Sequence, residues 1–235
     1  LVGQEEKSEV QAWYEDAAKR PCTWWLENHL VARHSLKSCM FCGMCTSVCP
    51  AAQYYEEYNP RYIVDTALSG DEDRIIALLR SDILWFCGQC GSCKARCTRE
   101  NNIMGLVSSL RCLSQMKGYH TSSARGRQQY AARHLWGANF WNRACSLYFR
   151  NNDAAGHPDF GPRHARYAAE LEAQHARVGG HPDMDGRFAG RKVNPATLRE
   201  LRRCVHVGGT LLLWNKLETH AGNQADALGL GIDEY

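Results

Sequence analysis

The chain has 235 residues, of which 44% are hydrophobic and 23% are charged, and its formal net charge is +3. These values are typical of a soluble globular protein of one or two domains, and they argue against binding of polyanions through overall charge. The 12 cysteines are a smaller share than the roughly 8–10% of a small disulfide scaffold. Most of them lie in two short runs, which favours metal binding in a reducing compartment.

The first 36 residues are expected to form helices. Apolar side chains recur at helical spacing from Ser8 to Arg20 and stop at Pro21, and a second helix is expected over residues 24–37. The opening stretch, LVGQEEKSEV, has no basic region followed by an apolar one, and no apolar run approaches the roughly 18 residues of a membrane span. We therefore expect a cytoplasmic protein that does not itself cross a membrane.

Two stretches of the sequence share one cysteine spacing. Residues 39–50 read CMFCGMCTSVCP, residues 87–98 read CGQCGSCKARCT, and both contain C-x-x-C-x-x-C-x-x-x-C. In two-cluster ferredoxins, three closely spaced thiolates hold one 4Fe–4S cluster and the fourth ligates the other cluster. The expected ligands of cluster one are Cys39, Cys42, Cys45 and Cys97. The expected ligands of cluster two are Cys87, Cys90, Cys93 and Cys49.

Zinc and disulfide bonds are the alternatives for these thiols. Tetrathiolate zinc sites usually use C-x-x-C pairs about 15–20 residues apart, which differs from two identical runs of four. Complete sets of four thiolates leave no iron free for a substrate, so the runs indicate electron transfer and no catalytic residue. The four remaining cysteines are scattered and are expected to be structural thiols: Cys22, Cys112, Cys145 and Cys204.

Residues beside the cysteines are expected to shape the site. Gly43, Gly88 and Gly91 would allow turns that direct backbone N–H groups toward sulfur. A set of apolar side chains would exclude water from the clusters or simply form core: Phe41, Met44, Val48, Trp85 and Phe86.

The segment between the runs, and the one after them, also read as helical. Asn59-Pro60 is a helix start, Gly70 an end, and Asp71 the cap of the next helix. Ser81 is expected to begin a short helix before the second run, and apolar residues at helical spacing follow over 103–113. With no strand alternation, the fold class is mainly α, with an α-helical ferredoxin domain over residues 37–120.

Residues 121–235 differ in composition. The stretch 121–217 has 15 Lys and Arg against 7 Asp and Glu, and one more helix is expected from Asn194-Pro195 to about Gly208. Because each oxidised cluster adds a charge of about −2, the ferredoxin part becomes acidic when loaded. We expect a basic, helical and irregular arm that contacts other subunits, and no nucleic-acid binding, because acidic residues interrupt the basic ones.

The chain resembles the C subunit of heterodisulfide reductase over roughly residues 35–118. The resemblance is carried by CMFCGMCTSVCP, by NPRYIVDTALSG and by DILWFCGQCGSCKARC. It implies an α-helical two-cluster subunit that relays electrons between a flavin-binding A subunit and a catalytic B subunit with Cys-Cys-Gly motifs.

The sequence also departs from that family. Thr98 follows Cys97 where the family usually has proline, and the long basic tail is more similar to heterodisulfide-reductase-like complexes of sulfur oxidisers. There the substrate is thought to be sulfane sulfur on a lipoate-binding protein. The alternative is the iron–sulfur subunit of another dehydrogenase, of the succinate or glycerol-phosphate type. The chain lacks the additional C-x-x-x-x-C-x-x-C motif of the former and the fused Cys-Cys-Gly module of the latter.

Overall fold

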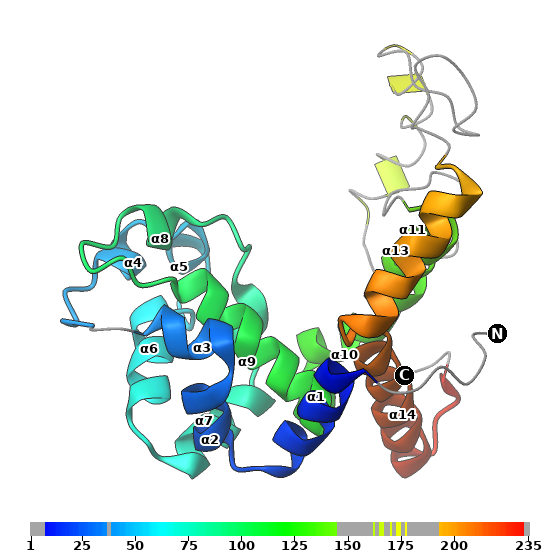
Figure 1. Cartoon of the computed structure of the whole chain (residues 1–235). Coiled ribbons are helices and arrows are strands. Elements are labelled where there is room, and N and C mark those ends of the chain that lie inside the picture. The colour runs from blue at the N-terminus through cyan, green and yellow to red at the C-terminus, as the bar shows by residue number, and fades with distance from the viewer. Residues whose placement is uncertain are drawn as a thin grey trace. The chain divides into compact units, whose positions relative to one another are not determined.

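The computed structural model describes residues 8–36, 39–144 and 193–232, together with residues 162, 165–166, 170, 173–174 and 177. Across these residues the secondary structure is helical and no strand occurs, which confirms the mainly α fold class (Figure 1). None of the described helices is both long and apolar enough to cross a membrane. The chain divides into two units, residues 1–129 with 207–235 and residues 130–206. The domain boundaries expected at residues 36 and 120 stay predictions.

Three helices open the first unit. They are α1 (Glu9–Lys19), α2 (Cys22–Asn28) and α3 (Leu30–Ser35). The single helix predicted over 24–37 is wrong, because the chain breaks at His29, whose Nδ1 accepts a hydrogen bond from the Ala32 N–H at 3.3 Å. The break lets the His29 ring stack on Trp25 at 4.6 Å, while the Trp25 indole N–H donates to Ser109 at 2.8 Å. Side-chain pairing in the core therefore overrides local helix propensity here.

Helix α2 has no side-chain cap of its own, and a residue distant in sequence supplies one. The carboxylate of Glu72 accepts hydrogen bonds from the backbone N–H groups of Cys22 at 2.6 Å and Thr23 at 3.0 Å. Burial raises the pKa of this carboxyl, but the hydrogen bonds from Cys22 and Thr23 outweigh it, so that the Glu72 pKa lies below its usual value. The same bonds tie α2 to α7 (Glu72–Arg80).

The core forms around α9 (Ile103–Lys117). This helix packs against α1, α3, α7 and α6 (Pro60–Leu68), as Figure 1 shows. Both predicted caps are confirmed, because the side chains of Asn59 and Asp71 accept hydrogen bonds from backbone N–H groups at the starts of α6 and α7. Leu106, Leu110 and Leu113 are fully buried, and each contributes about 1.5–3 kcal/mol of transfer free energy.

Short helices carry the two cysteine runs. They are α4 (Met44–Ser47), α5 (Pro50–Tyr54), the 3₁₀ helix η1 (Ile83–Phe86) and α8 (Ser92–Ala95). Helix α4 packs against α8, and α8 packs against α9, so that both runs meet near one end of the central helix (Figure 1). Asp82 precedes η1 as its N-cap residue, and Ser81 accepts the Ile83 N–H at 3.3 Å, close to the predicted start.

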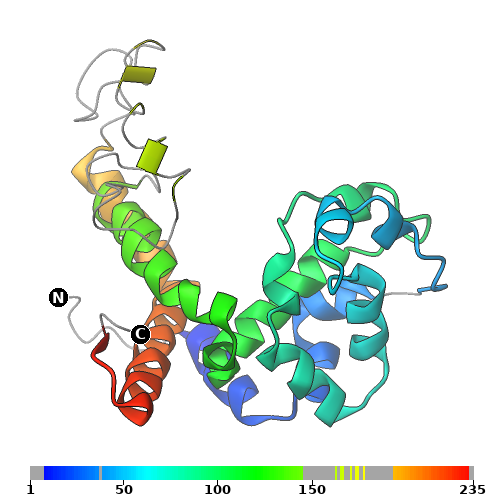
Figure 2. The same cartoon turned by 180° about the vertical axis from the view of Figure 1, so that it is seen from behind.

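The end of the chain returns to this unit. Helix α14 (Thr210–Leu228) packs on α9 and on the 3₁₀ helix η2 (Tyr119–Ser122). Its buried residues are Leu217, Ala221 and Ala225. Figure 2 shows α14, in red, from behind. Gly118 closes α9 with a φ of +77°, and a Cβ there would come within 2.8 Å of the His220 ring. Helix α14 was not predicted.

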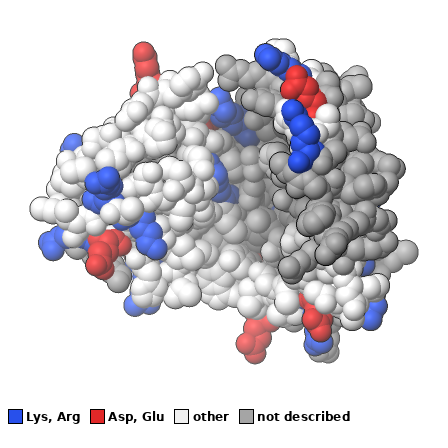
Figure 3. Space-filling model, turned by 90° about the horizontal axis from the view of Figure 1, so that it is seen from above, with Lys and Arg blue, Asp and Glu red and all other residues white. Residues whose placement is uncertain are grey.

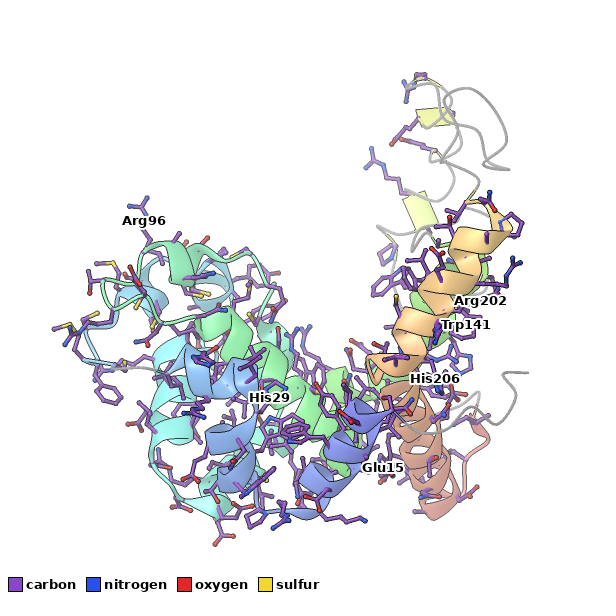
Figure 4. All side chains as sticks on the ribbon, viewed as in Figure 1. Glu15, His29, Arg96, Trp141, Arg202 and His206 are labelled. Atoms are coloured by element: carbon purple, nitrogen blue, oxygen red, sulfur yellow. The ribbon has the colours of Figure 1, made fainter. Side chains whose placement is uncertain are left out.

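The second unit contains η3 (Arg133–Gly137), α11 (Ala138–Arg143) and most of α13 (Pro195–Val207); α10 (Ala124–Ala132) runs into it. The helix predicted from Asn194-Pro195 is confirmed. Arg202 on α13 donates through Nε to the Trp141 carbonyl at 2.9 Å, with its guanidinium 5.3 Å from the centre of that indole (Figure 4). Cys145 lies outside the described residues.

Candidate cluster-binding site

The two cysteine runs fold in the same way. In each run the residue before the second cysteine has a left-handed backbone, with φ of +53° at Phe41 and +54° at Gln89. The glycine after that cysteine is also left-handed, with φ of +78° at both Gly43 and Gly91, and it begins a four-residue helix. These two glycines form the expected turns. At Gly88 φ is not positive, and the left-handed residue is Gln89 instead.

Four of the predicted ligands surround one hollow, which we call the first hollow. Its cysteines are Cys39, Cys42, Cys45 and Cys97. Cys39 and Cys42 come from the loop that leads into α4, Cys45 lies in α4 itself, and Cys97 comes from the opposite run, just after α8. Two backbone N–H groups point at these sulfurs, from Phe41 to Cys39 Sγ at 3.4 Å and from Asn101 to Cys97 Sγ at 3.3 Å.

The other four predicted ligands surround a second hollow. Its cysteines are Cys49, Cys87, Cys90 and Cys93. Cys49 reaches it as the residue that precedes α5. The Gln89 amide lies 3.6 Å from Cys87 Sγ, and the Cys90 thiol lies 3.4 Å from the Ser92 hydroxyl, a contact that lowers the Cys90 pKa. The structure thus brings the eight cysteines together as the sequence analysis grouped them, with one thiol exchanged between the runs.

The two hollows differ in their surroundings. Met40, Phe41 and Met44 at the first hollow are exposed, so the expectation that Phe41 and Met44 would exclude water is wrong for the chain by itself. The second hollow is lined by buried Tyr58 and contains buried Cys49. Burial, followed by the nearby Cys87, Cys49 and Cys93, raises the Tyr58 pKa far above its ordinary value.

Burial also affects the third cysteine of each run. It raises the pKa of the Cys45 thiol and of the Cys93 thiol, and the charges of Cys39 and Cys87, respectively, add to the effect. The two hollows are neighbours, because Ile103 lines both of them and helix α4 packs against α8.

Basic side chains gather around the first hollow. Arg61 and Arg99 line it, while Lys94 and Arg96 stand on or next to α8, and all four are exposed. Figure 3 shows blue Lys and Arg side chains on the surface seen from above, and in Figure 4 the Arg96 side chain extends outward beside α8. These cations would partly balance an anionic group in the first hollow.

The donor set fits two iron–sulfur cubes. Each hollow is lined by four cysteines, and four thiolates are the ligand set of one 4Fe–4S cluster. All eight are free thiols, and backbone N–H groups directed at sulfur are one of the features that tune such clusters.

Sequence reasoning missed the contributions from outside the runs. Tyr58 and Arg111 belong to no motif named above, and Arg61 lies in NPRYIVDTALSG but was not singled out. Their positions at the site depend on how α6 and α9 pack. Arg111 left one signal, since it is a charged residue between the apolar positions Leu110 and Leu113. The other described cysteines do not line either hollow; Cys22 is buried, Cys112 is half-buried and Cys204 is exposed.

Comparisons with known proteins point to the same chemistry. Residues 33–101 match the 4Fe-4S dicluster domain family. The chain is 39% identical over 83 residues to the C subunit of the ferredoxin:CoB-CoM heterodisulfide reductase of Methanosarcina acetivorans, covering 35% of this chain and 32% of that protein. It is 32% identical over 99 residues to the second iron-sulfur C subunit of the CoB–CoM heterodisulfide reductase of Methanocaldococcus jannaschii, covering 42% of this chain and 50% of that one.

A third relative is the C2 subunit of the H₂/formate:CoB-CoM heterodisulfide,ferredoxin reductase of Methanococcus maripaludis, with 37% identity over 84 residues, 36% of this chain and 43% of that protein. The matches thus span half or less of each relative. They extend over a length similar to that of the dicluster domain, which contains both cysteine runs. Residues 33–101 of this chain therefore match a 4Fe-4S dicluster domain, and a stretch of similar length is similar in sequence to part of the heterodisulfide reductase C subunits.

Proposed function

We propose that the chain is an electron-transfer subunit that holds two 4Fe–4S clusters. Cluster one would be held by Cys39, Cys42, Cys45 and Cys97, and cluster two by Cys87, Cys90, Cys93 and Cys49. The observation that carries the proposal is the presence of two neighbouring hollows, each lined by four thiols. When bound, such a cluster takes up and releases one electron at a potential set by its surroundings.

The chain's own residues support this role. Each hollow has a complete set of four thiols, so no position is left for a substrate to bind the metal. The N–H groups of Phe41 and Asn101 donate to sulfur at the first hollow, where they would stabilise negative charge. Tyr58 and Phe86, both buried, limit water near the second run. No residue is proposed to be catalytic.

The proposed setting is a heterodisulfide reductase-like complex in the cytoplasm. We infer that the chain relays electrons between a flavin-binding A subunit and a catalytic B subunit with Cys-Cys-Gly clusters, in sulfur or thiol oxidation. A lipoate-binding protein would present the substrate to the complex. The names of the relatives, all subunits of such reductases, support the heteromeric arrangement, and the basic composition of residues 121–217 supports the sulfur-oxidising variant.

Anaerobic purification tests the cofactor. The protein should be brown, absorb broadly near 400 nm and contain about eight irons and eight sulfides per chain, as two four-iron clusters require. Stoichiometric zinc without sulfide would refute the proposal. Co-purification of a Cys-Cys-Gly protein from the native host tests the setting, and a stable partner without that motif would reject it while leaving the clusters in place.

A further inference from the structure

Arg111 occupies an unusual position beside the second cysteine run. It projects from α9, and its Nε donates to the Leu84 carbonyl at 2.8 Å while its terminal N–H donates to the Cys87 carbonyl, also at 2.8 Å. Its guanidinium lies 5.3 Å from the centre of the Trp85 ring. The Arg111 side chain therefore connects α9 to η1 and to the first cysteine of the second run. Its own orientation is fixed by two hydrogen bonds and by the contact with the Trp85 ring.

The cation is taken out of water without receiving a carboxylate partner. Arg111 is half-buried, and burial lowers its pKa, an effect opposed by the negative forms of Cys87 and Tyr58. In the described ranges, ion pairs join Arg20 to Asp16 and Arg74 to Asp65, all well exposed, and none involves Arg111. The two hydrogen bonds named above join this half-buried guanidinium to neutral carbonyls, so among the described residues it lacks the negative charge that such groups ordinarily have nearby.

The groups that face Arg111 identify the missing charge. Cys87, whose carbonyl it binds, lines the second hollow together with Tyr58. A cube bound by four thiolates has a net charge of about −2 when oxidised and one unit more negative when reduced. A cluster in the second hollow would therefore supply the negative charge that Arg111 lacks. This inference rests on the proposed two-cluster function.

We propose that Arg111 is the internal counter-ion of cluster two and sets its reduction potential. A fixed positive charge stabilises the reduced cluster more than the oxidised one, because the reduced cluster carries one more negative charge. Arg111 therefore raises the potential of cluster two. The exposed arginines at the first hollow are screened by water and salt and have a smaller effect on cluster one.

Redox titration of the full-length holoprotein, followed by low-temperature EPR, tests the proposal. One electron from dithionite reduces each cluster, and the two midpoint potentials are read separately. Arg111→Gln should make reduction of cluster two about tenfold less favourable, a shift of about 59 mV to lower potential for a one-electron couple. Arg111→Lys retains the charge and should stay closer to the wild type. Cluster one should move little in either variant.

The matched control is Arg96→Gln, which removes the same charge from an exposed position beside Cys97. It should shift either potential less than Arg111→Gln, and added salt should abolish its effect. Equal potentials in the wild type and Arg111→Gln would overturn the proposal, as would equal shifts in Arg111→Gln and Arg111→Lys, which would make the role purely positional.

If the Arg111→Gln protein lacks a cluster that can be titrated, the iron content of the two variants tests the proposal. If iron analysis finds only one cluster in Arg111→Gln but both in Arg111→Lys, the need for the charge is supported. If both variants lose cluster two, Arg111 is a structural residue and the proposal fails. A wild-type protein without clusters would instead refute the proposed function itself, so the two failures are distinguishable.

Discussion

One residue in each cysteine run has a left-handed backbone conformation, which residues other than glycine rarely adopt. Phe41 and Gln89 have φ of +53° and +54°, a region that costs roughly 1–2 kcal/mol for a residue other than glycine. In the first run this turn lets the Phe41 N–H reach Cys39 Sγ, and in the second the Gln89 side chain reaches Cys87 Sγ. The strain therefore coincides with donors directed at the sulfurs, the feature that a cluster site requires.

The exchange of one thiol between the runs is testable at the same scale. Cys49→Ser should reduce the occupancy of cluster two, held by Cys87, Cys90 and Cys93, and leave cluster one in place, because Cys49 lines the second hollow only. We expect iron to fall to about half of the eight atoms expected for two clusters, and the EPR signal of cluster two to change.

Cys204→Ser is the matched control, because this exposed cysteine lies outside both runs. It should leave both signals and the iron content unchanged. Selective loss of cluster one in Cys49→Ser would contradict the crossed assignment and favour a site built within each run.

At the scale of elements, the central helix α9 organises the unit that contains the cysteines. One of its sides buries Leu106 and Leu110, Arg111 holds η1, and its C-terminal end meets α14 through Met116 and His220. The contact with α14 depends on a glycine. A side chain at position 118 would meet the His220 ring, and glycine avoids this contact because it has no Cβ.

Gly118→Ala should therefore loosen α14. Its φ of +77° strains alanine by about 1 kcal/mol, and the close approach to His220 should add roughly 1–3 kcal/mol of overpacking. Denaturant unfolding should show a loss of free energy of unfolding equal to the sum of the two terms. Backbone amide hydrogen exchange should rise first in α14.

The matched control is Gly70→Ala. Gly70 has a similar φ of +68° but has nothing within 4 Å of the added Cβ. It should cost only the backbone strain. If the two variants lose equal stability, the His220 contact contributes nothing to the docking of α14.

Most elements in the first 120 residues follow from local signals. Asn59 and Asp71 cap helices as the sequence predicts, and the cysteine spacing groups the thiols as the two hollows do. The break at His29 and the cap from Glu72 could not be predicted, because they depend on partners dozens of residues away. The same reason hides Tyr58 and Arg111, whose roles arise from packing against the second run.

At the scale of the whole molecule, the two units differ in composition and in the role that we propose for them. The first unit contains all eight cysteines of the runs, while helix α13 of the second has Arg199 and Arg203 exposed, one helical turn apart. The domain boundaries at residues 36 and 120 and the role of residues 121–235 in contacts with other subunits stay proposals. Because α14 belongs with the first unit, a truncation after Gly118 would also uncover α9 and would not test the arm alone.

Charge reversal on α13 tests the arm without this complication. Arg199→Glu combined with Arg203→Glu should weaken recovery of the native complex by roughly tenfold at low salt, since opposite charges steer association. Recovery is measured with the tagged full-length chain in the native host, and cluster content should not change.

Thr197→Ala, at an exposed position of the same helix, is the control for a general effect of substitution. It should leave recovery unchanged. Full recovery of the complex with the doubly reversed variant would show that this face of α13 takes no part in assembly.

The packing of α14 on α9 has a consequence for how the protein is made. Met116 and His220 meet although 104 residues separate them. At about 5–20 residues per second, the ribosome needs roughly 5–20 s to cover that distance. Both cysteine runs have emerged well before then, while the part of α9 that α14 covers is still exposed. The newborn chain therefore has an interval in which iron delivery can precede closure, and in which an apolar helix face requires protection from aggregation.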